Sequence, residues 1–230
     1  MNESAKEKII NTIKVKAVTK QIVYDNTLKA FNLIKKTLKQ LVKEYNAELQ
    51  DVDERVLLEY KDRGAFEAEI KIAGDLLIFN MHSNVFDFDA DHNVWKISYV
   101  KDNDYTSFAG IINIYNFLSD SFKYNRLDDL GYLIGRIFIN KDMHYFVEGK
   151  RQLGFLYNDF GNSVLDEDAI KNIVESAILY SLDFDLLVPK YDNVMLATVA
   201  QMKERINKSK IVTGKRLGFQ FYKDDDDIVG

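Results

Sequence analysis

The hydrophobic period of this chain changes near residue 54, and that change limits the folds open to it. Within the first fifty residues apolar side chains recur at helical spacing, most clearly over 27–48. From about residue 54 apolar and polar residues alternate, which is typical of strands with one buried and one solvated face. The pattern therefore predicts helices first and an antiparallel sheet after them.

Two helices are expected before the sheet, over 4–23 and 27–48. Asp25, Asn26 and Thr27 carry side-chain oxygens that can cap a helix, so we place the start of the second helix there. Several β-branched residues lie in the second half of the first helix, and these lower its helix propensity. Residues 1–50 are thus expected to form a basic helical segment.

Turn-forming residues divide the middle of the chain into short strands. The strands expected there are 56–60, 66–72, 76–81, 85–89 and 94–100, with one of the turns at 82–84. We further expect a strand over 110–117 with a helical turn at 120–124, a hairpin of 131–139 with 143–148, and a short strand at 153–157. The succession predicts a β-meander within residues 51–160.

The C-terminal part, residues 161–230, is expected to hold helices and a last strand. A helix over 167–182 has an apolar face and Asp166 or Asp168 as its N-cap, and a second helix runs from near Pro189 to about 207. A final strand is expected at 217–222. The fold class is therefore α+β, a mainly antiparallel sheet flanked by N-terminal and C-terminal helices, in a single domain spanning 1–230.

The absence of cysteine excludes several kinds of chemistry. Disulfides, zinc–thiolate sites and cysteine nucleophiles all need a thiol, and the chain has none. The N-terminus lacks the apolar stretch of a secretory signal, and no apolar run approaches the roughly 20 residues that span a bilayer. We expect a cytoplasmic protein that needs no cofactor.

Charge is distributed unevenly along the chain. Residues 1–50 hold ten lysines against five acids, whereas the whole chain has a net charge of −5, so the remainder carries −10. A basic face can meet nucleic acid, an acidic partner, or the acidic remainder of its own chain or of a twin subunit.

One candidate catalytic set consists of Asp53, Glu69 and Lys71. An acid on one strand followed by acid-x-Lys on the next resembles metal-dependent nucleases of the PD-(D/E)xK type. The resemblance implies that the two carboxylates hold Mg²⁺ and that the lysine assists the attacking water. The alternative is an exposed cross-strand charge pair, since glutamate and lysine are common on solvated sheet faces.

A candidate metal site lies at Asp87, Asp89 and Asp91. Carboxylates at alternate positions resemble the first half of a calcium loop, but His92 stands where that loop needs glycine and Ser98 where it needs its closing acid. A hairpin tip stabilised by local hydrogen bonds explains the same residues without a metal. The chain has no HExxH pair, no P-loop and no nucleophile elbow.

These observations favour a binding or adaptor protein that acts through protein–protein contacts and self-associates, for instance as a homodimer. Abundant tyrosine and phenylalanine and the divided charge support that expectation. The lysine face of helix 27–48, formed by Lys35, Lys36, Lys39 and Lys43, is the expected partner-binding surface. Two alternatives stay open, the Mg²⁺-dependent nuclease and a nucleic-acid-binding protein that uses this lysine face.

Overall fold

The computed structural model describes residues 4–184, 198–200 and 203, which fall into two compact units. The first unit contains residues 1–119 and 130–184 and holds every strand that is described. The second contains residues 120–129 and 185–230. Of the last predicted helix, residues 199, 200 and 203 are described and are helical. The rest of that predicted helix, apart from Thr198, and the predicted strand at 217–222 lie outside the described residues.

One long helix replaces the two that were predicted at the N-terminus. It consists of α1 (Ala5–Thr12), the π-helical turn η1 (Ile13–Ala17) and α2 (Val18–Glu48) without interruption. The predicted caps lie inside α2 because their side chains are used differently, Thr27 within the helix and Asn26 in a tertiary contact. Thr27 Oγ1 donates to the Val23 carbonyl at 2.7 Å, and Asn26 Nδ2 donates to the carbonyls of Asn140 and Lys141.

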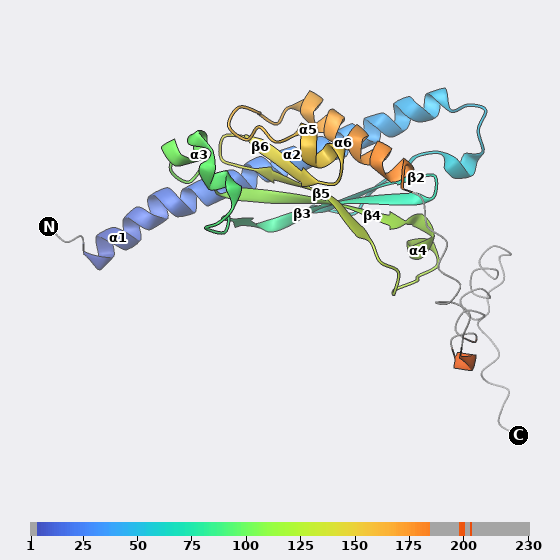
Figure 1. Ribbon diagram of the computed structural model, residues 1–230, viewed down its shortest axis with the longest axis horizontal. Helices are drawn as coiled ribbons and strands as arrows, with labels where there is room; N and C mark the ends of the chain where they lie inside the picture. Colours follow the sequence, from blue (N-terminus) through green and yellow to red (C-terminus); the bar gives the residue numbers. More distant parts are fainter. Residues whose placement is uncertain (1–3, 185–197, 201–202, 204–230) are drawn as a thin grey trace, which may run out of the picture. The chain divides into compact units, whose positions relative to one another are not determined.

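The sheet has six antiparallel strands in the order β1-β2-β3-β4-β5-β6, which confirms the α+β prediction. Their bounds are β1 (Glu59–Asp62), β2 (Glu67–Ile72), β3 (Asp75–Phe86), β4 (Ala109–Leu118), β5 (Tyr132–Ile139) and β6 (Tyr145–Gly149). A 3₁₀ turn, η2 (Glu54–Val56), replaces the start of the first predicted strand. Each strand pairs with its neighbour in sequence, so the sheet is a simple meander (Figure 1).

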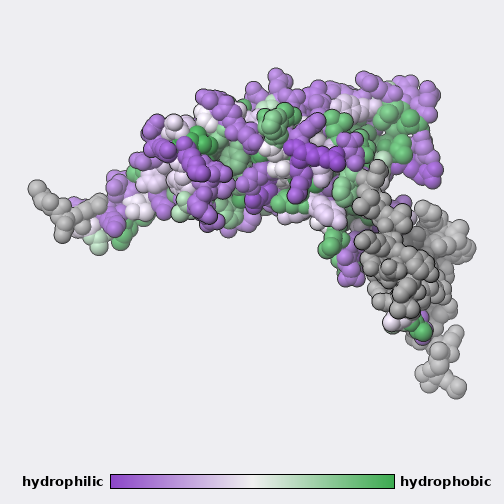
Figure 2. All heavy atoms as spheres, in the orientation of Figure 1, coloured by the Kyte–Doolittle hydropathy of each residue, from purple (hydrophilic) through white to green (hydrophobic). Residues whose placement is uncertain are grey.

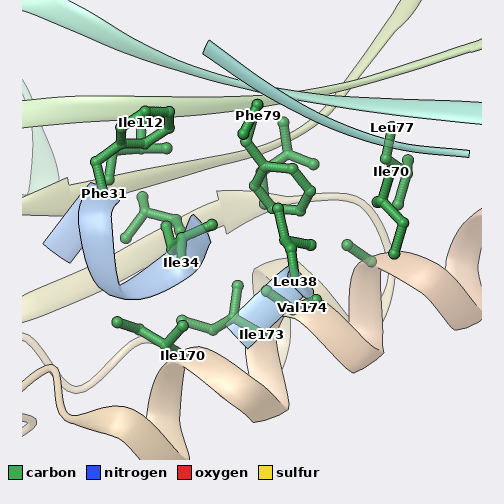
Figure 3. Packing of buried hydrophobic residues seen from close by; sticks show 14 of the residues in the cluster. Phe31, Ile34, Leu38, Ile70, Leu77, Phe79, Ile112, Ile170, Ile173 and Val174 are labelled. Carbon is green, nitrogen blue, oxygen red and sulfur yellow. The ribbon is translucent and has the colours of Figure 1, made fainter. Parts of the chain in front are cut away.

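Two helices, α2 and α6 (Glu167–Leu182), cover one face of this sheet and form the main core with it. Figure 3 shows Phe31, Ile34 and Leu38 of α2 reaching toward Phe79 and Ile112 of the sheet, with α6 closing the layer. Asp166 caps α6 by accepting a hydrogen bond from Ala169 N, as one of the two predicted caps. Alternating apolar residues of each strand supply the sheet side of the core.

A second, aromatic cluster lies against the opposite faces of β5 and β6, where Phe138 and Phe146 stack with ring centroids 4.8 Å apart. Residues 94–100, predicted as a strand, form η3 (Asn93–Lys96) and the start of α3 (Ser98–Asp102) on this cluster. The strand prediction was wrong because a local side-chain hydrogen bond favours a helical turn. His92 Nδ1 accepts from Val94 N and so caps η3. Trp95, Ile97 and Tyr99 still pack on the cluster, as partly buried residues.

Two further predictions were wrong in their local geometry. Residues 82–84 are not a turn, because β3 continues through them with a register irregularity between Met81 and Val85. Residues 153–157 are not a strand, since α5 (Gln152–Leu156) occupies them. The edge of β6 instead receives loop residues, with Val147 N bonded to the Tyr157 carbonyl and Tyr145 N to that of Ser163.

The helical turn predicted at 120–124 is present as α4 (Ser119–Lys123), most of which belongs to the second unit. Ser121 Oγ donates to Asp129 Oδ2 at 2.6 Å, and Arg126 pairs with the same carboxylate at 2.8 Å. None of the helices in the described part of the chain is long and apolar enough to cross a membrane.

A partly buried carboxyl at the start of β3 makes stability depend on pH. Burial raises the pKa of Asp75 above its ordinary value, although a hydrogen bond from Asn116 opposes the shift. Asn116 Oδ1 is buried and has no hydrogen-bond partner among the described residues. Because the folded-state pKa is raised, ionisation of Asp75 lowers the free energy of unfolding above that pKa. This loss of stability vanishes below the unfolded-state pKa of about 3.9.

We therefore expect Asp75→Asn to stabilise the protein at pH 7 by on the order of 1 kcal/mol, since the new amide can donate to Asn116 Oδ1. Urea unfolding at pH 7 and pH 3 measures it. The pH-dependent part of the gain should disappear at pH 3, where Asp75 is protonated in both states. A variant less stable than wild type at pH 7 would contradict this account.

Candidate protein interaction surfaces

The first candidate surface is the N-terminal arm, which we define as residues 4–22. A capping box starts it: Ser4 Oγ accepts from Glu7 N, and the Glu7 carboxylate accepts from Ser4 N at 2.8 Å. No residue of α1 or η1 is buried, and Thr19 is the first to reach the body of the protein. In Figure 1 the arm extends past the end of the sheet toward the N-terminus.

Four aliphatic residues follow one another along the arm, each one turn after the last. These are Ile9, Ile13, Val18 and Ile22, and their exposed fractions are 60%, 57%, 50% and 44%. The π turn joins the two halves of this set, because Val18 N donates to the Ile13 carbonyl five residues earlier. In a regular helix Ala17 and Gln21 would occupy those positions. We call these four residues the arm ridge.

The arm ridge lowers the stability of the monomer, and no residue of α1 or η1 is buried to offset that cost. β-branched side chains lose rotamer freedom in a helix, and here they also expose apolar area to water. Ile10 and Val15 add further exposed aliphatic surface at 41% and 43%. Figure 2 shows apolar colour on the arm beside its charged residues. Contiguous exposed apolar surface of this kind is characteristic of interaction sites.

The arm is also strongly basic. It carries five lysines, at 6, 8, 14, 16 and 20, against the single acid Glu7, which is engaged in the capping box. Lys16 and Lys20 lie over the ring of Phe108, with Nζ 5.6 and 4.8 Å from its centroid. Lys6, Lys8 and Lys14 remain exposed next to the arm ridge, so a partner surface needs both apolar and acidic groups.

The second candidate surface lies where α5 packs against α6. Arg151, just before α5, lies over the Tyr180 ring and pairs with Asp183, whereas Tyr157 just after α5 bonds to Ser176. The two helices are therefore antiparallel, and Tyr157 after the end of α5 contacts Ser176, which lies about one turn before Leu179 on α6. The exposed residues there are Phe155 at 80%, Leu156 at 57%, Leu179 at 57% and Leu182 at 50%. We call these four the α5–α6 patch; Figure 2 shows apolar colour at α5.

Close backbone contact positions this patch. A Cβ built on Gly154 would lie 2.3 Å from the Gly149 carbonyl oxygen, so only glycine lets α5 approach the end of β6 this closely. Leu153, next to it, is buried in the main core. The neighbouring Phe155 and Leu156 are exposed on the other side of this short helix.

Acidic groups border the α5–α6 patch. The Tyr45 hydroxyl donates to Glu175 Oε1 at 2.6 Å. Burial raises the pKa of Tyr45, and the bonded Glu175 raises it further. Glu44 and Glu48 lie within one turn of Tyr45 on α2. Asp183 lies at the end of α6. Two of these acids are paired with cations, Glu175 with Lys171 and Asp183 with Arg151, whereas Glu44 and Glu48 are exposed carboxylates that a basic partner can meet.

The structure places the predicted nuclease residues in separate environments. Asp53 caps η2, and its carboxylate binds Arg55, whose hydrogen bonds lower the pKa of Asp53. Glu69 and Lys71 share the outer face of β2, where Glu69 is buried and pairs with Arg63 at 2.8 Å while Lys71 pairs with Glu59. No hydrogen bond or ion pair joins Asp53 to Glu69 among the described residues. The nuclease hypothesis stays a prediction.

The predicted lysine face is partly engaged in contacts within the chain. Lys35 is only 13% exposed in its side chain and bonds to Asp62, and Lys36 pairs with Glu167 at 2.9 Å. Lys39 and Lys43 are exposed on α2. Their role in partner binding stays a prediction.

The aspartates at 87, 89 and 91 are exposed in the loop between β3 and η3. This loop is organised by its backbone, since the Asp89 carbonyl accepts from Trp95 Nε1 at 2.8 Å and from His92 N. Within residues 4–184, 198–200 and 203, no group of three or more acidic or histidine side chains is placed to hold a metal ion.

The sequence prediction missed the arm ridge because it assumed a regular helical period. Ile9 and Ile13 are one turn apart, as are Val18 and Ile22, but a step of five residues separates the pairs. That five-residue step was the signal in the sequence that could have revealed the arm ridge.

Comparison with known proteins adds no assignment: no protein-family model, curated protein or solved structure matches this chain.

Proposed function

We propose that this chain is a binding or adaptor protein that acts through protein–protein contacts, with the arm as its docking element. The arm ridge carries this proposal, because four exposed aliphatic side chains are aligned on a basic helix that is anchored only at one end. Its charge calls for a partner surface with apolar and acidic groups. Such a helix suits binding along a groove or against another helix face.

The arm also has the rigidity that a docking element needs. It continues directly into α2, whose residues Val23, Ala30 and Phe31 are fully buried, so the ridge is held in a helical conformation before a partner binds. An isolated helix of this length is only marginally stable in water. Preorganisation of this kind lowers the entropic cost of association.

Substitution of the ridge should abolish partner binding and leave the fold intact. We expect Ile13→Glu to remove the bound partner when the tagged full-length protein is captured from a native lysate, because the charge would be desolvated in the interface. Asn11→Glu, which adds the same charge at an exposed arm position off the ridge, is the matched control. Mass spectrometry reads both captures, with and without added nuclease.

Three outcomes of that capture separate the alternatives. A protein partner that resists nuclease, is lost with Ile13→Glu and is kept with Asn11→Glu supports the proposal. Material that disappears with nuclease would instead favour nucleic-acid binding. Equal capture by wild type and Ile13→Glu would contradict a role for the arm ridge.

A further inference from the structure

Two exposed surfaces on this chain are complementary to each other. The arm ridge is aliphatic and flanked by lysines, whereas the α5–α6 patch is apolar and has Glu175 on α6, bonded to Tyr45 of α2, whose neighbours Glu44 and Glu48 are exposed. Each has the shape of a helix surface, and each exposes aliphatic side chains to water. Apolar contact between them would bury both, and opposite charges at the rim would fix their orientation.

The arm cannot reach the patch of its own chain. Glu167 at the start of α6 pairs with Lys36, and Glu175 further along bonds to Tyr45, so α6 runs parallel to α2. The α5–α6 patch therefore lies beside the C-terminal end of α2. Since the arm and α2 form one continuous helix, the arm ridge and the patch are separated by about 45–50 Å along its axis.

We propose that the partner of the arm is a second copy of this chain, with the arm ridge of one protomer seated on the α5–α6 patch of its twin. This inference rests on the proposed function and names the partner of the same docking element. A two-fold axis near the middle of the long helix makes both contacts at once, because it brings the N-terminal end of each long helix to the C-terminal end of the other. Both arms and both patches are then covered.

The size of the contact sets the expected strength of the dimer. The arm helix is about 27 Å long and about 10 Å wide, so two reciprocal contacts remove on the order of 1,100 Å² from water, at the low end for a specific interface. The dimer should consequently dissociate on dilution. The like-charged arms disfavour the alternative of arm against arm, since five lysines on each helix would be brought together.

Cross-linking between two distinguishable chains tests this arrangement. The chain contains no cysteine, so every introduced thiol is unique. Full-length Ile13→Cys protein is mixed with a longer-tagged Leu179→Cys protein and treated with a short bismaleimide. We expect the mixed species to dominate over either homotypic species. In the control, Ser98→Cys takes the place of Leu179→Cys. Ser98 adjoins Tyr99, whose hydroxyl bonds to Asp142 and Asn140, and Asn140 in turn accepts a hydrogen bond from Asn26 of α2. Ser98 therefore lies at the end of the body that is nearest the arm.

Each result decides between specific possibilities. Mixed Ile13→Cys with Leu179→Cys product, without Ser98→Cys product, supports the twin arrangement. A dominant Ile13→Cys homotypic product would overturn it in favour of arm-to-arm pairing. The absence of any cross-linked product, together with capture of a different protein that Ile13→Glu abolishes, would overturn the twin as partner and leave the proposed function standing. If neither a cross-linked product nor a captured protein is found, the proposed function is rejected as well.

Discussion

Gly110→Ala should destabilise the protein by about 3 kcal/mol or more, at the upper end of the cost of overpacking a core. A Cβ on Gly110 of β4 would lie 1.9 Å from Oγ1 of Thr27 and 2.8 Å from its Cβ. Thr27 is fully buried in α2 and bonded to the Val23 carbonyl, so it cannot move aside. The helix that carries the arm would have to separate from the sheet at this point.

Thermal and urea unfolding measure this loss, which corresponds to roughly 10 °C in Tm for a chain of this size. Gly74→Ala is the control, because nothing lies within 4 Å of a Cβ there. Thr27→Ala should recover part of the loss in the double variant, since it removes the closest atom, and the recovery would appear as a coupling energy. Equal stability of the Gly110→Ala and Gly74→Ala variants would refute the close contact of α2 with β4.

Insertion of one alanine after Ala17 should eliminate the association of the arm. The extra residue rotates Ile9 and Ile13 by about 100° relative to Val18 and Ile22, so the arm ridge is divided between two faces of the helix. The body of the protein is untouched, because α1 and η1 have no buried residue. Circular dichroism and thermal unfolding should therefore match wild type.

Deletion of Ala17 is the matched control for that insertion, and it has the opposite expectation. Removing one residue shortens the step from Ile13 to Val18 to four, which is one turn of a regular α-helix. The arm ridge then stays on one face, and the strained π turn is replaced by the more favourable α geometry. Association should be retained in the deletion variant, although both variants alter the same turn.

The sequence predicted the order of helices and strands because periodicity reports which face of an element is buried. The helical stripe of α6 was read correctly, with Asp166, one of the two predicted caps, as the cap. The alternation in β2 placed Ala68, Ile70 and Ile72 correctly in the core, but Glu69 on the other face is buried, not solvated. The boundaries failed where polar side chains serve tertiary contacts. Asn26 has the composition of a helix cap, yet its amide holds the turn between β5 and β6, which no local pattern reveals.

The candidate surfaces were harder to predict than the fold. Residues 153–157 were expected to form a strand, and only the packing of Gly154 on Gly149 shows why α5 is a helix that exposes Phe155. The lysines of α2 drew attention as a charge run, but Lys35 and Lys36 bind acids of their own chain. The uneven charge could be read from the composition. The positions of the arm ridge and the α5–α6 patch could be found only once the direction of α6 relative to α2 was known.

Sedimentation velocity of the full-length protein over a wide concentration range tests whether the arm ridge binds a second copy of this chain. Three chains are compared: wild type, the Ala17 deletion and the alanine insertion. We expect a concentration-dependent monomer–dimer equilibrium for wild type and the deletion variant, and a monomer at every concentration for the insertion variant. A wild-type protein that stays monomeric at every concentration, or an insertion variant that dimerises like wild type, would contradict this expectation.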